Sequence, residues 1–445
     1  MTVRGAAFLG IGAMVGAGIF ALLGEAGAVA GAAVWLSFLL AGIVAGLLGY
    51  TVVKLGVRFP SSGGLIAYLV EGFGNGRLVG IASWLGYFAA IVIVCSMVAV
   101  AFGSYATSLL IGGDAGAAWD NVFTSAIVLG MLALNMVGSK VVDRAQSLIV
   151  VVLLAVFAGF VCVTIVDIDF GLLAFSGYPS LPDIISSVAL TFFAYLGFSV
   201  ITFAVGDLRD PARELPKAMY LALGVTTATY VLISVGVFGT LTVDEVTGFG
   251  ETAIAEAARP ALGEFGFVMM AIAGLLATAS SVNATIYASG GLTAMLASTG
   301  QFPPFFGRDS QLGSHAGLLI TSALVLVVAN VIDLSAIASV GSACSLLIFL
   351  LVGIAGYRRR ADTDSRAALV LAAVVVTAIV LVFFAVDTLR NAPETFAAIV
   401  AIALLAMALD FMWKRTRPAR AHSGLVAGRG PRAASPNLPP HNREP

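Results

Sequence analysis

Twelve long apolar segments constrain this chain more than any other feature of its sequence. Each is close to the roughly 20 apolar residues that an α-helix needs to cross a bilayer. Hydrophobic residues make up 60% of the chain and charged residues 11%, which excludes an ordinary soluble domain. Because backbone groups in lipid must be hydrogen-bonded within the chain, we predict an all-α polytopic membrane protein. The predicted spans lie near residues 4–31, 33–57, 77–111, 121–138, 145–167, 183–206, 217–242, 263–299, 315–332, 335–357, 366–386 and 395–413.

The first span carries four glycines in its middle, within the run GIGAMVGAGIF at residues 10–20. Each glycine costs an α-helix roughly 1 kcal/mol relative to alanine, so the run favours a break at mid-membrane. A break in hydrocarbon survives only where protein, water or a ligand satisfies the freed N–H and C=O groups. Close approach of a neighbouring helix is the alternative reason for so many small residues.

A second run, TFFAYLGFS at residues 191–199, interrupts the sixth span. The first and sixth spans start on opposite sides of the membrane. We therefore predict two inverted-topology repeats, 1–167 and 183–357, whose broken first helices meet at the midplane. Non-helical backbone is expected at Val15–Gly18 and at Leu196–Ser199. N–H groups at one broken end suit a carboxylate and carbonyls at the other suit an ammonium group or Na⁺, so a zwitterion fits the pair.

The basic residues predict the orientation of the chain. With the N-terminus in the cytoplasm, 21 of the 23 lysines and arginines fall on the inner side, and only Arg259 and Arg390 fall outside. Twelve spans in the inner membrane, with both termini cytoplasmic, account for this partition. The triplet Arg358–Arg360 is interpreted as a topology anchor, with anionic-lipid binding as a second interpretation. Residues 414–445 are rich in Arg, Pro, Gly and Ser, which predicts a disordered cytoplasmic tail.

Three motifs resemble the amino acid–polyamine–organocation (APC) transporters. They are GIGAMVGAGIF in the first span, FPSSGG at residues 59–64, and FFAYLGFS followed by GDLRDPARELPKAM. The resemblance extends over residues 1–413. It implies the bacterial leucine-transporter fold, with a core over residues 1–357, discontinuous helices 1 and 6, and two peripheral helices over residues 366–413. It also implies an amino acid permease that works by alternating access.

The resemblance further implies a substrate site at the two breaks. The substrate carboxylate would bind the backbone N–H groups of Gly16, Ala17 and Gly18. The α-ammonium group would bind the backbone carbonyls of Met14, Phe193, Ala194 and Leu196. Ordinary packing is the alternative explanation for each residue that could select the substrate side chain, and these candidates are Tyr87, Phe198, Ser199, Asn283 and Tyr287.

Two departures from the family pattern bear on the substrate and on the coupling ion. Many relatives that move cationic substrates carry an acidic residue where this chain has Ser199. Without a carboxylate at mid-membrane a second buried ammonium group would be unpaired, so we expect a small neutral amino acid. Relatives that are coupled to protons often carry a lysine where this chain has Leu153, so a lysine-based proton mechanism is not expected.

The missing lysine leaves a place for a sodium ion between the first and eighth helices. By resemblance, the stretch ATASS at residues 277–281 faces the first helix in sodium-coupled members of the fold. The implied ligands are neutral oxygens, namely the carbonyls of Gly12, Val15 and Ala277 and the hydroxyls of Ser280 and Ser281. Hydrogen bonds from both serines to their own helix are the alternative. Proton coupling through another group and plain exchange also stay open.

Other classes of function find little support in the sequence. No combination of nucleophile, base and orienting group indicates an enzyme. The three cysteines include no CxxC pair, and a net charge of −1 gives no indication of a nucleic-acid partner. No cofactor is expected beyond a coupling ion, Na⁺ or a proton. The alternatives to a permease that imports a small neutral amino acid are an amino acid exchanger, an amine or organocation permease and, with less support, a transporter-like sensor.

Overall fold

The computed structural model describes residues 2–61, 64–112, 116–137, 142–166, 168–307 and 315–416. All regular secondary structure in these ranges is helical, as predicted. By length and composition, nine helical stretches within them could cross a membrane, and four further apolar helices are shorter. The count of twelve spans therefore stays a prediction. The predicted tail begins inside the last helix, which continues to Thr416, and the rest of the tail lies outside the described residues.

The predicted first repeat contains a broken first span and a third span with a π-helical turn. Its elements, in chain order, are α1 (Val3–Ala17), α2 (Ile19–Ala30), η1 (Gly31–Ala33), α3 (Val34–Arg58), α4 (Gly64–Phe73), α5 (Arg77–Tyr87), the π-helical η2 (Phe88–Ile93), α6 (Val94–Leu110), α7 (Gly116–Val137) and α8 (Val142–Thr164).

The predicted second repeat also opens with a broken span, and two further helices follow it. The elements are η3 (Phe175–Gly177), α9 (Leu181–Phe193), the 3₁₀ helix η4 (Leu196–Asp207), α10 (Pro211–Phe238), α11 (Val243–Phe249), η5 (Gly250–Thr252), α12 (Ala253–Glu256), α13 (Arg259–Ser298), η6 (Pro304–Phe306), α14 (Ala316–Val331), α15 (Leu334–Arg358), α16 (Ala367–Asn391) and α17 (Pro393–Thr416).

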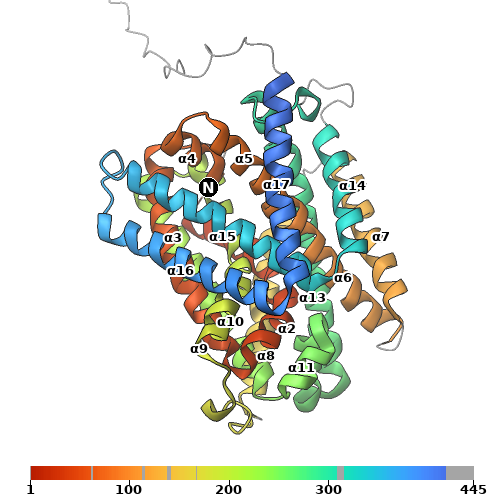
Figure 1. Ribbon diagram of the computed structural model, residues 1–445. Helices are drawn as coiled ribbons and strands as arrows, with labels where there is room; N and C mark the ends of the chain where they lie inside the picture. Colours follow the sequence, from red (N-terminus) through yellow and green to blue (C-terminus); the bar gives the residue numbers. More distant parts are fainter. Residues whose placement is uncertain are drawn as a thin grey trace, which may run out of the picture.

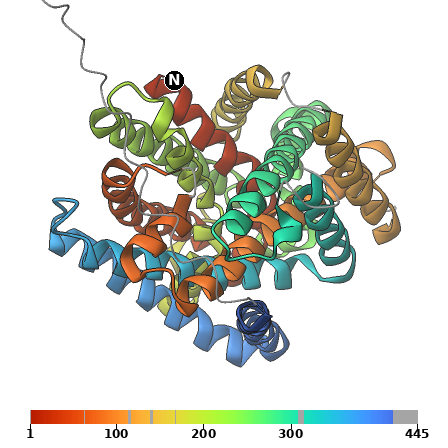
Figure 2. The same ribbon diagram turned by 90° about the horizontal axis from the view of Figure 1, so that it is seen from above.

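Helix α1 lies inside the bundle, where it packs against α8, α10, α13 and η4. Its side chains at Ala6, Ala7, Ile11 and Met14 are fully or almost fully buried. A helix that is apolar all round belongs in the interior of a bundle. Helix α16 packs across α3, α9 and α15, and α17 stands at the outer edge of the bundle beside α5 (Figures 1 and 2).

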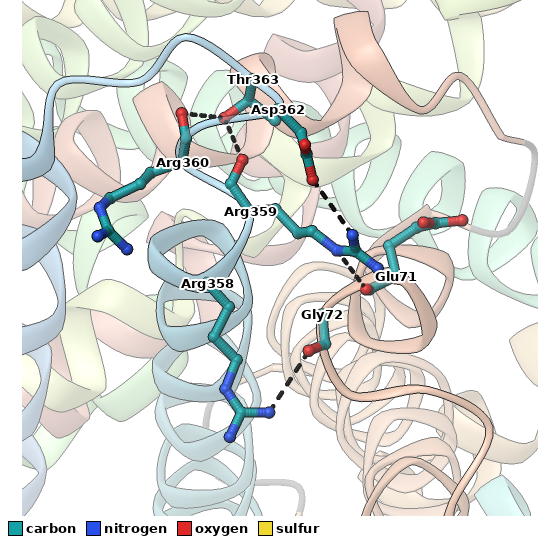
Figure 3. Close-up of polar contacts among 7 residues, drawn as sticks. All are labelled: Glu71, Gly72, Arg358, Arg359, Arg360, Asp362 and Thr363. Carbon is teal, nitrogen blue, oxygen red and sulfur yellow. Dashed lines mark hydrogen bonds and ion pairs between the residues drawn. The ribbon is translucent and has the colours of Figure 1, made fainter.

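Arginines at the end of α15 tie that helix to α4 (Figure 3). Arg358 Nη1 donates to the carbonyl of Gly72 at 3.5 Å, and Arg359 Nε donates to the carbonyl of Glu71 at 2.8 Å. These carbonyls end α4, where the last C=O groups lack an intrahelical partner and a cation is favourable. Arg359 also pairs with Asp362 at 3.2 Å. Two arginines of the triplet therefore join α15 to α4, which is a structural role that the sequence had not indicated.

Candidate functional site

The first break lies at Gly18, within the predicted window, between the end of α1 and the start of α2. The N–H group of Gly18 donates to the carbonyl of Met14 at 2.9 Å, and the carbonyl of Gly18 accepts from Leu22 N–H at 3.0 Å. Gly16 and Ala17 lie in the last turn of α1, where N–H groups point back along the helix to its own carbonyls. The three N–H groups expected to bind a carboxylate are therefore taken up by the helix itself.

The backbone N–H groups that are free to bind a ligand at this break lie one turn further along the chain. The first N–H groups of an α-helix have no acceptor within their own helix. In α2 these groups belong to Ile19, Phe20 and Ala21, which are all buried. The positive end of the helix dipole lies at the same turn and favours an anion. A carboxylate would therefore meet the N-terminal turn of α2 rather than the residues Gly16–Gly18.

The second break lies at Ala194 and Tyr195, so the predicted position at Leu196–Ser199 is wrong by two residues. Helix α9 ends at Phe193, a turn follows, and η4 begins at Leu196. The hydroxyl of Tyr195 donates to a carbonyl of α3 at 2.9 Å and fixes this turn. The glycine of the motif, Gly197, lies inside η4 and serves close packing.

Gly197 lets the two broken segments touch. A Cβ atom at this position would lie 2.5 Å from the carbonyl carbon of Ala13 and 2.5 Å from the backbone nitrogen of Met14. Both are backbone atoms of α1, which cannot rotate aside as a side chain can. Close approach of helices, the alternative reason for small residues in this chain, is therefore the role of Gly197.

Tyr230 of α10 joins the two breaks through one hydroxyl group. The hydroxyl donates to the carbonyl of Met14 at 2.7 Å and lies 3.2 Å from the carbonyl of Ala194. The side chain is fully buried, and its ring packs edge-on against the ring of Tyr195. Met14 and Ala194 supply two of the carbonyls expected to bind an ammonium group. Tyr230 was not predicted from the sequence, because a single tyrosine in an apolar span has no distinguishing pattern.

Four further candidates lie at the second break or just after it. Phe193 ends α9 and is buried, and Phe198 packs its buried ring 5.1 Å from the ring of Phe349 on α15. The hydroxyl of Ser199 donates to the carbonyl of Leu196 at 3.0 Å. That bond engages another of the carbonyls expected to bind the ammonium group, while the aromatic rings give this side of the break an apolar lining.

Two predicted selectivity residues have partners elsewhere in the structure, and a third is exposed. The hydroxyls of Tyr87 and Thr321 of α14 lie 2.8 Å apart, within hydrogen-bonding distance. Asn283 accepts a hydrogen bond of 2.8 Å from Asn135 of α7. Tyr287 is 61% exposed. The first two are thus engaged with other helices and the third is exposed, so the expectation that all three face the substrate is not supported.

The helices of the predicted sodium site do meet. A Cβ atom at Gly16 would lie 2.7 Å from the carbonyl oxygen of Ala277 and 3.0 Å from the Cβ atom of Ser281, so α1 and α13 touch here. Val15 lies in the last turn of α1, whose carbonyls have no intrahelical partner. Gly12 lies deeper in the helix, where its carbonyl belongs to the helical ladder. The contact that a sodium site requires is therefore present, with Gly12 its least suitable predicted ligand.

Two carboxylates beyond the first break were not singled out by the sequence. Glu25 lies on α2 and Glu251 on η5. The two elements are in contact, since a Cβ atom at Gly24 would lie 2.8 Å from the carbonyl oxygen of Gly250. Burial raises the pKa of Glu251 above its usual value near 4.5, and the charge of Glu25 raises it further. Glu25 follows Gly18 by seven residues, or about 10 Å of helix, so it lies beyond the break itself.

Comparison with known families identifies the chain. The family model described as "Amino acid permease" matches residues 2–408. The chain belongs to the amino acid permease family. The resemblance to APC transporters is thereby confirmed, and the protein is a membrane transporter rather than an enzyme.

Two curated bacterial relatives support this assignment. The inner membrane transport protein YbaT of Escherichia coli K12 is 30% identical over 409 residues, which cover 92% of this chain and 95% of that protein. The serine/threonine exchanger SteT of Bacillus subtilis is 26% identical over 312 residues, which cover 66% of this chain and 67% of that protein. Transporter relatives together with apolar helices show a multi-pass integral membrane protein.

The fold is shared with a solved transporter of very different sequence. A crystal structure of a manganese transporter mutant from Eremococcus coleocola matches with a TM-score of 0.61 and 13% sequence identity, covering 93% of this chain and 94% of that chain. At this identity the likeness shows the fold alone. The bundle of helices with discontinuous first and sixth spans is the predicted leucine-transporter fold.

Proposed function

We propose that this permease is a secondary active transporter that imports a small neutral amino acid by alternating access. The observation that carries the proposal is the meeting of the two breaks, α1–α2 and α9–η4, at the hydroxyl of Tyr230. The N-terminal turn of α2 supplies N–H donors for the substrate carboxylate. The carbonyls of Met14 and Ala194 supply acceptors for its α-ammonium group.

Tyr230 indicates how the site responds to its substrate. The hydroxyl is a neutral donor with a single proton, whereas an ammonium group has three donors and a positive charge. Hydrogen bonds with an ionised partner are roughly twice as strong as those between neutral groups. An ammonium group at the Met14 and Ala194 carbonyls would therefore displace or share the Tyr230 hydroxyl. That exchange would favour the substrate-bound arrangement of both broken helices.

A neutral side chain on the substrate fits the lining of the second break. Phe193 and Phe198 are buried and apolar, and Ser199 stands where a carboxylate would be needed for a cationic substrate. In the described part of the chain, Met14, Gly18 and Ala194 hydrogen-bond to backbone groups and to the Tyr230 hydroxyl, without a carboxylate. The relative named as a serine/threonine exchanger supports the same substrate class.

We infer that both termini lie in the cytoplasm and that the protein resides in the inner membrane. The partition of the basic residues supports this orientation, and the relative YbaT is named as an inner membrane protein. For the coupling ion we propose Na⁺ at the crossing of α1 and α13. Leu153, which is buried on α8, offers no amine to take the place of that cation.

Uptake into proteoliposomes tests the proposal. Radiolabelled serine, threonine and alanine should accumulate against their gradients when an inward gradient of Na⁺ is present, whereas arginine and agmatine should not. Protein-free liposomes give the background. Accumulation of arginine or agmatine alone would contradict the substrate class. Uptake that requires preloading with a second amino acid would identify an exchanger instead, and accumulation driven only by a pH gradient would replace Na⁺ with a proton.

A further inference from the structure

We propose that a cavity between the start of α5 and the end of α17 binds the phosphate head group of an anionic phospholipid. The cavity has a volume of about 240 Å³ and is lined by Arg77, Phe411, Lys414 and Arg415. Three of its four lining residues are cationic. The inference rests on the proposed orientation, which puts this end of both helices at the cytoplasmic surface, and it is independent of the transported substrate.

The charge of the cavity is only partly balanced within the protein. The guanidinium groups of Arg77 and Arg415 lie 5.9 Å and 6.0 Å from the centroid of the same Phe411 ring. Among the described residues, neither arginine forms an ion pair. Lys414 differs, because its Nζ atom lies 2.8 Å from the buried carboxylate of Asp410. Two positive charges thus share one cavity, and an anion between them would offset their repulsion.

The two helices that line the cavity are held together by specific contacts, unlike a patch of mobile surface lysines. Lys414 Nζ also donates to the carbonyl of Gly76 at 3.1 Å, which ties the end of α17 to the start of α5. A Cβ atom at Gly80 would collide with the carboxylate of Asp410, so the glycine lets α17 seat closely against α5. The first turn of α5 contains no acidic residue, and its N-cap makes no side-chain hydrogen bond. The positive end of that helix therefore adds to the positive field of the arginines.

The surroundings of the cavity favour a lipid over a soluble phosphate. Helix α17 lies at the edge of the bundle (Figures 1 and 2), and only 11% of its most apolar stretch of 18 residues is buried. Leu404, Met407 and Phe411 follow one another at helical spacing on one face, and they are 55%, 42% and 50% exposed. An acyl chain lying along this face would reach the cavity at the Phe411 ring. Anionic lipids at the cytoplasmic surface attract basic residues near the membrane.

The arginine triplet of α15 is less suited to this role. Arg358 and Arg359 donate to carbonyls at the end of α4, and Arg359 also pairs with Asp362 (Figure 3). The ion pair with Asp362 offsets the charge of Arg359, and the bonds to the α4 carbonyls hold both guanidinium groups at the helix junction. The lipid-binding interpretation of a basic cluster therefore belongs to Arg77 and Arg415, which the sequence had not grouped because 338 positions separate them.

Lipid titration of the purified full-length protein in detergent tests the inference. Phosphatidylglycerol should raise the Tm of the wild type, and phosphatidylcholine and inorganic phosphate at equal concentration should not. Native mass spectrometry should show bound phosphatidylglycerol. In the double variant R77Q/R415Q the apparent affinity should fall roughly 30-fold, because each basic residue near the surface contributes to anionic-lipid binding.

Arg213→Gln is the matched control, because Arg213 also lies on the proposed cytoplasmic side and its side chain is 83% exposed. This variant should bind phosphatidylglycerol as the wild type does. The single variant Arg415→Gln, on the last turn of α17, keeps the test decisive if the double variant fails to fold. Unchanged phosphatidylglycerol affinity in the arginine variants would overturn the site. An equal rise in Tm with inorganic phosphate would overturn the lipid as its occupant.

Discussion

The hydroxyl of Tyr230 lies against carbonyls from both broken helices, although it has only one proton to donate. The shorter distance is to Met14, at 2.7 Å, and the longer is to Ala194, at 3.2 Å. The carbonyl of Ala194 is therefore the less well satisfied of the two. An ammonium group could donate to both carbonyls at once. In the proposed function, the residue would therefore connect the integrity of the breaks with the binding of a zwitterion.

Replacing Tyr230 by Phe should weaken both the contact between the two breaks and the binding of the substrate. The change removes one buried hydrogen bond, so unfolding should become easier by about 1 kcal/mol. The KM for uptake should rise, while the protein still inserts into the membrane. Tyr220→Phe is the control, since Tyr220 lies on the same helix and is 45% exposed. If Tyr230→Phe matches the wild type in both Tm and KM, the hydroxyl does not connect the two breaks.

Some residues of the site could be predicted from the sequence and others could not. The break at Gly18 was predicted because clustered glycines weaken a helix. The second break was predicted at Leu196–Ser199 but lies at Ala194 and Tyr195. A glycine such as Gly197 can break a helix or admit a neighbouring one, and the sequence does not distinguish the two roles. Asn283 was expected at the substrate, but it pairs with Asn135 from 148 positions away. Such a pairing depends on the tertiary arrangement and leaves no local pattern.

At the scale of elements, the segment after the second break has an unusual form. Helix η4 is a 3₁₀ helix of 12 residues, whereas runs longer than 3–4 residues are uncommon. Its rise of roughly 2.0 Å per residue makes it about 6 Å longer than the same residues in an α-helix. A 3₁₀ segment in the middle of a span often marks a hinge. Helix η4 packs on α1, so a change of its length would move the contact at Gly197.

The contact between α1 and α13 yields a prediction about sodium. If Na⁺ binds there, substrate should bind more tightly in sodium buffer than in choline buffer. Ser280→Ala should weaken the binding of substrate in sodium by about tenfold, which corresponds to about 1.4 kcal/mol. Ser298→Ala, at the end of α13, should not. Radioligand binding to the purified protein measures these four affinities: the wild type in sodium and in choline, and each variant in sodium. Equal affinity in sodium and choline, with Ser280→Ala unchanged, would rule out this site.

The packing of η5 on α2 and α6 predicts a dependence on pH. Burial, followed by the charges of Glu25 and Asp120, raises the pKa of Glu251 above its usual value near 4.5. The folded state then holds the proton more tightly than the unfolded chain does. Its contribution to stability is complete below pH 4.5 and is lost as the pH rises through the folded pKa. Glu251→Gln should therefore have a higher Tm than the wild type at neutral pH, and the difference should vanish on acidification.

Glu245→Gln is a control of opposite sign on the neighbouring α11. Glu245 accepts hydrogen bonds from the backbone N–H and the hydroxyl of Thr242, both at 2.8 Å, and these bonds lower its pKa. Its contribution to stability is present above pH 4.5 and is lost as the pH falls through the folded pKa. This variant should therefore have a lower Tm than the wild type at neutral pH. Equal responses of the two variants in thermal unfolding across pH would contradict the assignment.

At the scale of the whole molecule, the sequence was sufficient for the fold class and the order of the elements. Apolar segments of spanning length and two interrupted spans predicted an all-α membrane protein with an inverted repeat. The resemblance to APC transporters implied the leucine-transporter fold, which the comparison of structures supports. The sequence was insufficient for the contacts between segments, such as Tyr230 across both breaks and α17 against α5. Small residues permit these contacts, but only the packed bundle determines which partner each of them meets.

The central claim is that transport depends on the contact of the two breaks. Uptake of radiolabelled serine, threonine and alanine by proteoliposomes containing Gly197→Ala tests it most directly. The added Cβ atom would lie 2.5 Å from backbone atoms of Ala13 and Met14, so α1 and η4 must move apart. Gly224→Ala on α10 is the control, because a Cβ atom there meets nothing within 4 Å. We predict that uptake is lost in Gly197→Ala and kept in Gly224→Ala, with equal membrane insertion. Wild-type uptake by Gly197→Ala would contradict the account.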